Sequence, residues 1–130
     1  MIITDKVKTA FFNACKEAAF FVQSEENEAH VMASQYEKLF FYHCMSFLYC
    51  AWPYYLAENR KRNEKKESIK TVECLGGDFI LSACGHGVGF FEYGVSDWLY
   101  HGDVLDKIAE KYFYNGYGFY ADDNGELIGE

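Results

Sequence analysis

The sequence predicts an α+β domain in which N-terminal helices pack against a small antiparallel sheet and one C-terminal helix. Two observations predict this class. Apolar residues recur at helical spacing through about residue 66, and from Gly76 onward short apolar runs alternate with turn-forming residues. A chain of 130 residues, half of them hydrophobic, has the size of one domain. We therefore expect a single domain over 1–130, with a helical half 1–70 and a hairpin-helix-hairpin half 71–130.

The first predicted helix spans about 5–23. Thr4 or Asp5 can cap its N-terminus. Its apolar residues recur at steps of three and four, the period of a buried helical stripe: Val7, Phe11, Ala14, Ala18 and Phe21. This spacing predicts one face packed on the core.

The second predicted helix spans about 25–51, and Pro53 either kinks it or starts a third helix at about 54–66. One stripe of the second helix is predicted to face the core: Met32, Tyr36, Leu39, His43, Phe47 and Cys50. Further apolar residues lie outside this stripe, so we expect the helix to be central or partly covered by a second chain. In the third helix, Glu58 and Arg62 have helical i,i+4 spacing, and the run 59–70 is expected to be a solvated helix end or loop.

The pattern changes at Gly76-Gly77, which predicts a turn. Residues 78–84 and 88–93 are predicted to be two strands of a hairpin joined through 85–87. The glycines on either side of His86 allow the positive φ values that tight turns require.

A second hairpin is predicted at the end of the chain. Gly102 and Asp103 open a helix of about 104–114, which is followed by strands at 117–121 and 126–128. The residues between these strands, Asp122-Asp123-Asn124-Gly125, are typical of a turn. They do not have the spacing of a calcium loop.

The formal net charge of −8 is unevenly distributed. Residues 1–58 carry 4 basic and 7 acidic groups, residues 59–70 carry 6 basic and 2 acidic groups, and residues 71–130 carry 2 basic and 11 acidic groups. An acidic C-terminal half repels phosphate, so direct binding to nucleic acid is disfavoured and a basic protein partner is favoured. The role of the basic segment 59–70 stays open.

Cysteine usage indicates a reducing compartment. The five cysteines are odd in number and irregularly spaced, and the first residues do not resemble a signal peptide. The longest apolar run, 39–55, contains histidine, serine and proline, which argues against a membrane span. We expect a cytoplasmic protein.

Three patterns could carry chemistry. Residues 85–89, G-H-G-V-G, match neither a dinucleotide-binding nor a P-loop pattern. Cys84 and His86 could pair as nucleophile and base or as two zinc ligands, and His101 could join them, but no further ligand stands at a recognised spacing. His43 is expected to be a hydrogen-bonded core residue. The sequence therefore predicts no catalytic residue, no metal and no cofactor, and keeps a small enzyme or metal protein centred on Cys84, His86 and His101 as an alternative.

The remaining signal is a surface of carboxylates interleaved with aromatic side chains. Carboxylates on a rigid scaffold can imitate a phosphate backbone, and tyrosine and tryptophan are typical interface anchors. An ordinary acidic surface is the competing interpretation. The residues expected to bind a partner are Glu92, Asp97, Trp98, Tyr100, Asp103, Asp106, Glu110, Tyr117, Asp122 and Asp123.

Residues 78–82 and 85–92, D-F-I-L-S and G-H-G-V-G-F-F-E, resemble a segment of small bacteriophage proteins with the pattern D-F-x-L-T-R-x-G-H-G-A-G-F-W-D. In that family a G-D-x-L-T-x-x-A helix and a Y-x-G-D-D-G-x-I/L ending follow, as 102–109 and 120–128 do here. The arginine before G-H-G is missing, with Ala83-Cys84 in its place. The residues that carry the motif are Gly85, His86, Gly87, Gly89 and Phe90.

The resemblance implies a phage origin and no catalytic residues. Small acidic phage proteins often inhibit host defences, so we expect a non-enzymatic protein that blocks the nucleic-acid surface of a CRISPR effector or restriction enzyme in the host cytoplasm. A homo-oligomeric structural or regulatory module is the other alternative, and a homodimer is left open.

Overall fold

The computed structural model describes residues 2–22, 31–84, 89–90, 97–113 and 119–129. The α+β class is confirmed, because helices accompany a three-stranded mixed sheet. The elements in chain order are α1 (Asp5–Val22), β1 (Val31–Met32), α2 (Ser34–Glu64), α3 (Val72–Ala83), α4 (Gly102–Ala109), β2 (Phe119–Ala121) and β3 (Glu126–Gly129).

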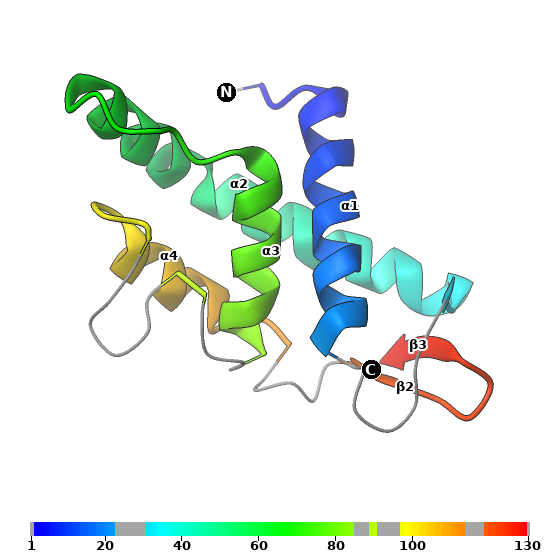
Figure 1. The fold of residues 1–130 in the computed structure, drawn as a ribbon. Helices are drawn as coiled ribbons and strands as arrows, with labels where there is room; N and C mark the ends of the chain where they lie inside the picture. The colour runs from blue at the N-terminus through cyan, green and yellow to red at the C-terminus, as the bar shows by residue number, and fades with distance from the viewer. Residues whose placement is uncertain (1, 23–30, 85–88, 91–96, 114–118, 130) are drawn as a thin grey trace.

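Figure 1 shows α1 and α3 side by side, with the long helix α2 crossing behind both. The sheet lies near the start of α2, and α4 lies along its C-terminal half. Stacked rings fill the space between the three helices. The ring centroids of Phe47 and Phe79 lie 4.0 Å apart, and the ring of Phe11 stacks with both. Among the described helices, none has the length and apolar composition that crossing a membrane requires.

Helix α1 begins as predicted, with the hydroxyl of Thr4 accepting a hydrogen bond from the amide of Val7 at 3.3 Å. Its buried stripe differs from the predicted one by a small rotation, because Phe21 is exposed. The side chains that α1 buries are Phe11, Cys15, Ala19 and Val22.

The two helices predicted at 25–51 and 54–66 are one helix, and residues 31–32 form a strand instead of helix. Pro53 lies inside α2. A proline there costs a backbone hydrogen bond and crowds the preceding turn. The helix continues because Pro53 is exposed while the buried face runs on without interruption from Leu48 through Tyr55. The core-facing stripe predicted for the second helix is also partly wrong. Leu39 and Cys50, which it includes, are exposed, whereas Phe40 and Leu48, which it leaves out, are buried.

The strand predicted at 78–84 and the turn at Gly76-Gly77 are wrong: both belong to helix α3. Thr71 caps this helix, its hydroxyl accepting from the amide of Cys74 at 3.1 Å. The strand predicted at 88–93 is contradicted at Gly89 and Phe90, which form a bend. Its other residues, and the predicted turn 85–87, lie outside the described residues. The buried residues of α3 recur at helical spacing: Leu75, Gly76, Phe79, Ile80 and Ala83.

The C-terminal hairpin is confirmed, and the helix before it is shorter than predicted. Helix α4 ends at Ala109, whereas 104–114 was expected. Strand β3 pairs antiparallel with β2, and the turn between them is held by Asp122, whose carboxylate accepts from the amides of Asn124 and Glu126 at 2.9 Å each. Strand β1, which the sequence did not predict, pairs parallel with β3.

Candidate functional site

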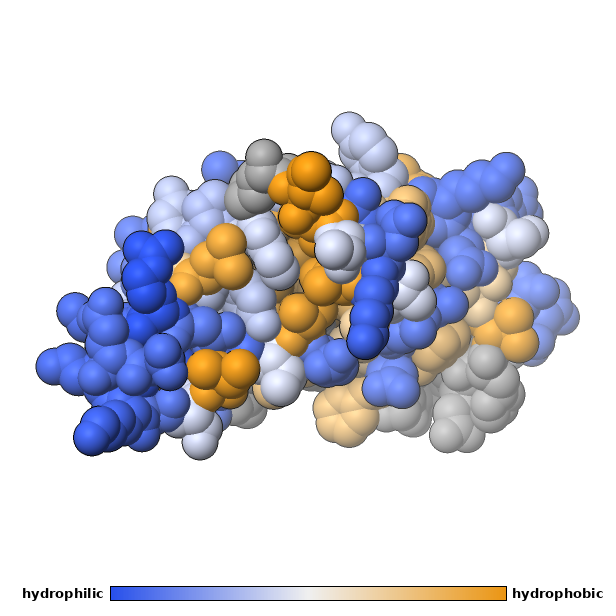
Figure 2. Space-filling model, turned by 90° about the horizontal axis from the view of Figure 1, so that it is seen from above, coloured by the Kyte–Doolittle hydropathy of each residue, from blue (hydrophilic) through white to orange (hydrophobic). Residues whose placement is uncertain are grey.

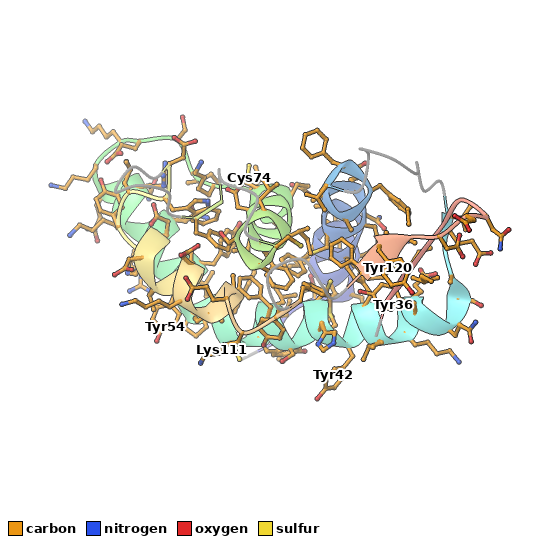
Figure 3. The ribbon with its side chains drawn as sticks, turned by 90° about the horizontal axis from the view of Figure 1, so that it is seen from below. Tyr36, Tyr42, Tyr54, Cys74, Lys111 and Tyr120 are labelled. Carbon is orange, nitrogen blue, oxygen red and sulfur yellow. The ribbon has the colours of Figure 1, made fainter. Side chains whose placement is uncertain are left out.

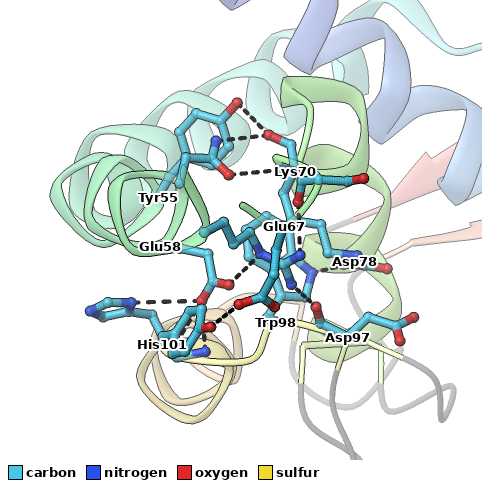
Figure 4. A network of polar contacts seen from close by, with 12 residues as sticks. Tyr55, Glu58, Glu67, Lys70, Asp78, Asp97, Trp98 and His101 are labelled. Atoms are coloured by element: carbon cyan, nitrogen blue, oxygen red, sulfur yellow. Dashed lines mark hydrogen bonds and ion pairs between the residues drawn. The ribbon is translucent and has the colours of Figure 1, made fainter. Parts of the chain in front are cut away.

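The most buried polar group of the described structure is an ion pair at the C-terminal end of α2 (Figure 4). The Nε of Arg62 donates to the Oε2 of Glu58 at 2.6 Å, and the Glu58 side chain is fully shielded from solvent. Charged groups are buried at a cost that only a partner and further hydrogen bonds offset. The remaining oxygen and nitrogens of the pair should therefore all be in use.

The second oxygen of Glu58 holds the segment that leads into α4. It accepts hydrogen bonds from the amides of Tyr100, at 3.0 Å, and His101, at 2.7 Å. A carboxylate next to the N-terminus of a helix is also favoured by the helix dipole. Glu58 thus fixes where α4 begins, a role that the N-cap residue His101 does not supply with its own side chain.

Arg62 binds the backbone at the start of this segment and in the connection between α2 and α3. Its guanidinium donates to the carbonyl of Ser68 at 2.9 Å and to the carbonyl of Asp97. Beside it, the indole of Trp98 donates to the carboxylate of Asp78 on α3 at 2.6 Å. Partial burial raises the pKa of Asp78, and the indole hydrogen bond opposes that rise. Together these contacts, the Glu58–Arg62 network, tie the start of α4 to α2 and α3.

Asp103 and Asp106 of α4 and Glu110, the residue that caps its C-terminus, form a row of carboxylates, which we name the acidic α4 face. Lys107 lies 3.7 Å from the carboxylate of Asp103 within this row. The spacing of three and four residues places the carboxylates on one side of the helix. Partial burial raises the pKa of Asp106, and the neighbouring Glu110 and Asp103 raise it further, while a hydrogen bond with Ser82 lowers it. The like charges therefore lie close enough to interact.

The predicted partner-binding residues do not form one surface. Asp97, Asp103, Asp106 and Glu110 lie at α4 or directly before it, and Asp97, Asp103 and Glu110 are exposed. Asp122 and Asp123 lie on the hairpin at the other end of the molecule (Figure 1). Glu92 and Tyr117 lie outside the described residues.

Two of the three predicted aromatic anchors are placed by the structure. Trp98 is 1% exposed, so its role as an exposed anchor is wrong: the indole packs on Phe90 and Tyr55. Tyr100 is half-buried and its hydroxyl donates to the carboxylate of Glu67. Of the predicted anchors that the structure describes, Tyr100 is the one that remains available beside the acidic α4 face.

The described part of the phage-like motif has structural roles. The amide of Phe90 donates to the hydroxyl of Ser82 at 2.8 Å, and the Phe90 ring is buried. A Cβ at Gly89 would lie 2.8 Å from the backbone nitrogen of Ser82, so the close approach requires glycine. Gly85, His86 and Gly87 lie outside the described residues. Gly89 and Phe90 accordingly pack against Ser82 at the end of α3.

The cysteine and histidine chemistry considered from the sequence has little support in the described residues. Burial raises the pKa of Cys84 to about 12, whereas a nucleophilic cysteine needs a lowered pKa. The Nδ1 of His101 lies 3.6 Å from Glu58 and makes no hydrogen bond. Within the residues that the structure describes, no three potential ligands gather to hold a metal ion. His43 packs edge-on against Tyr112 and Phe113, and burial lowers its pKa.

The sequence shows the helical spacing of Glu58 and Arg62, but the expectation of a solvated run from residue 59 is wrong at Arg62, which is buried with Glu58. The signal for burial was present, since both residues continue the face of Ala51 and Tyr55. The distant backbone partners of the pair, Asp97, Tyr100 and His101, follow 35 to 43 residues later in the chain and could not be found in the same way.

No protein-family model, curated protein or solved structure matches this chain.

Proposed function

We propose that this chain is a non-enzymatic phage protein that binds a basic, nucleic-acid-handling protein of the host cytoplasm and blocks its nucleic-acid surface. The acidic α4 face makes the contact. A CRISPR effector or a restriction enzyme is a partner of this kind. The observation that carries the proposal is the row of Asp103, Asp106 and Glu110 on a helix whose start is fixed by a buried network.

The charge spacing of this row suits the role. Seven residues of helix rise about 10 Å, so the face presents three carboxylates over roughly 10 Å. The carboxylates are therefore spaced by about 5 Å along the helix axis, a wider spacing than the roughly 3.4 Å between phosphates of one DNA strand but of the same order. A groove that binds phosphates could accept the helix in place of a strand.

Rigidity supports the same role. Flexible acidic side chains on a mobile helix would lose conformational entropy when they bind. The carboxylate of Glu58 and the guanidinium of Arg62 hold the backbone at 97–101, and Ser82 holds Asp106. The acidic α4 face is therefore already ordered in the folded chain and loses little further conformational entropy on binding.

The basic segment 59–70 sets the orientation of a partner. Helix α4 runs back along α2, with His101 near Tyr54 and Tyr112 bonded to Ser46 at 2.8 Å. Glu110 consequently lies farther than Asp103 from the basic end of α2. A basic partner is expected to approach the Glu110 end.

The test is capture of partners from a bacterial host lysate with the tagged chain, washed at low and high salt and identified by mass spectrometry. We expect one nucleic-acid-handling protein, lost as salt rises. The variant Asp103→Asn/Asp106→Asn/Glu110→Gln should lose it. The matched variant Glu17→Gln/Glu64→Gln/Glu73→Gln, which removes three exposed carboxylates elsewhere, should retain it. Equal capture by both variants would refute the role of the acidic α4 face.

A further inference from the structure

The outer side of α2 carries a row of exposed apolar and aromatic residues, which we name the α2 seam. The exposed fractions are 37% for Leu39, 68% for Tyr42, 44% for Tyr49 and 41% for Leu56. Figure 3 shows Tyr42 pointing away from α1 and α3. The six seam residues are Leu39, Tyr42, Ser46, Tyr49, Pro53 and Leu56; five of them are exposed, and Ser46 is partly buried and shares a hydrogen bond with Tyr112 at 2.8 Å.

The spacing of the seam is that of a helix-pairing surface. The steps between its residues are three, four, three, four and three, which is the a/d pattern of a coiled coil. The buried stripe of α2, which includes Phe40 and Phe47, lies on the opposite side of the helix. From 39 to 56 the sequence contains no charged residue. The Nζ of Lys8 lies over the Tyr49 ring at one edge of the seam, 5.4 Å from the ring centroid, and the rest of the seam fits an apolar helix of the same kind better than a charged partner.

We propose that the α2 seam binds the α2 seam of a second copy of this chain, in antiparallel orientation. In antiparallel pairs, a positions of one helix face d positions of the other. One register covers the whole seam. It places Leu39 against Leu56, Tyr42 against Pro53 and Ser46 against Tyr49 of the second copy. The two-fold axis that relates the two copies then lies beside α2 at the level of residues 47 and 48.

The charges at the two ends of α2 favour this orientation. At the C-terminal end, Arg60, Lys61, Lys65 and Lys66 are exposed, and Figure 2 shows hydrophilic side chains gathered there. At the start of α2 lies the acidic hairpin, which the amide of Ala33 joins through the carbonyl of Leu127 at 2.9 Å. Its exposed acids are Asp123 and Glu126.

An antiparallel pair brings the basic end of each copy to the acidic hairpin of the other, whereas a parallel pair would bring like charges together. The seam covers about 26 Å of helix. Stable interfaces bury about 800 Å² per partner, so the charged ends are needed as well as the seam. A groove of about 310 Å³ beside Leu39, lined also by Gln35 and Ile128, lies where the second copy's residues 56–60 would pass.

The inference goes beyond the proposed function, because it needs no host protein and leaves the acidic α4 face outside the seam. Its first test is the mass of the purified chain in solution by sedimentation velocity over a concentration series. The unsubstituted chain, the parent of the variants below, is expected to have twice the mass of one 15.0 kDa chain, and added salt should shift the measured mass toward 15.0 kDa. Tyr42→Asp/Leu56→Asp should be monomeric throughout.

The control is Ile69→Asp/Leu99→Asp, which changes residues that are 60% and 54% exposed and lie outside α2. It should dimerise as the parent does. A parent that stays monomeric at every concentration, or a seam variant that dimerises like the control, would overturn the proposal. Circular dichroism spectra equal to the parent's would show that the seam variant is folded.

Orientation is tested by cross-linking in a Cys50→Ser/Cys74→Ser background, which removes the two exposed cysteines. Leu39→Cys and Leu56→Cys chains are purified separately, then mixed and mildly oxidised. The antiparallel register predicts a disulfide-linked dimer in the mixture and none in either chain alone. Disulfide dimers of each chain alone would instead show a parallel pair and overturn the register.

Discussion

At the scale of single residues, Glu58 is a buried side chain that positions the exposed acidic α4 face. It is inaccessible to solvent, yet its two oxygens bind Arg62 and the two amides before α4. A buried ion pair is not in itself a strong source of stability, but breaking one leaves an uncompensated charge. Both the stability of the domain and the placement of the acidic α4 face are therefore expected to depend on this carboxylate.

Glu58→Gln is predicted to lower the free energy of unfolding by about 3–5 kcal/mol, because the Arg62 guanidinium then lies buried without a counter-charge. Urea unfolding monitored by circular dichroism measures the change. Asp103→Asn is the control, since Asp103 and Lys107 also stand at i,i+4 spacing but are exposed and 3.7 Å apart. It should cost no more than about 0.5 kcal/mol. Equal costs for the two variants would contradict a structural role for the network.

At the scale of elements, the contact between α1 and α3 explains why Gly76 occurs inside a helix. A Cβ at Gly76 would lie 2.8 Å from the carbonyl oxygen of Phe11 and 3.1 Å from the Cβ of Ala14. The neighbouring Gly77 has nothing within 4 Å of that position. Gly76 is therefore required by packing and Gly77 is not, although the sequence presents them as one dipeptide.

Gly76→Ala and Gly77→Ala are predicted to change stability in opposite directions. The first forces α1 and α3 apart and should cost about 1–3 kcal/mol. The second should gain roughly 0.5–1 kcal/mol, because alanine loses less conformational entropy in a helix. Thermal unfolding of the two variants beside the parent measures both. Destabilisation of similar size by both changes would mean that α3 is not packed in this way.

The same glycines show which parts of the fold local sequence patterns predict and which parts they do not. Local periodicity predicted α1 and the C-terminal hairpin, because their patterns are not overridden by distant contacts. It failed at α3, where Gly76-Gly77 and the run Phe79-Ile80-Leu81 favour a turn and a strand, and where the close approach of α1 decides otherwise. It failed likewise for Trp98, whose burial depends on α3. The acidic residues of α4 were predicted, but the network that positions them was not.

At the scale of the whole molecule, three groups of charged residues in the described part of the chain lie at or beside α2. The acidic α4 face lies along α2, the basic residues lie at the C-terminal end of α2, and the acidic hairpin lies near its start (Figure 1). We propose that the acidic α4 face binds a host protein, and that the basic end of α2 and the acidic hairpin bind a second copy of the chain. A dimer of this kind would present two acidic α4 faces to its targets.

The most direct test of the central claim is an equilibrium competition between this chain and a DNA or RNA duplex for the host protein that it captures. Fluorescence anisotropy of a labelled duplex bound to that protein provides the signal. The parent chain is predicted to displace the duplex completely, and Asp103→Asn/Asp106→Asn/Glu110→Gln is predicted to leave it bound. A ternary complex, in which the host protein holds the duplex and the parent chain together, would contradict the claim that the chain blocks the nucleic-acid surface.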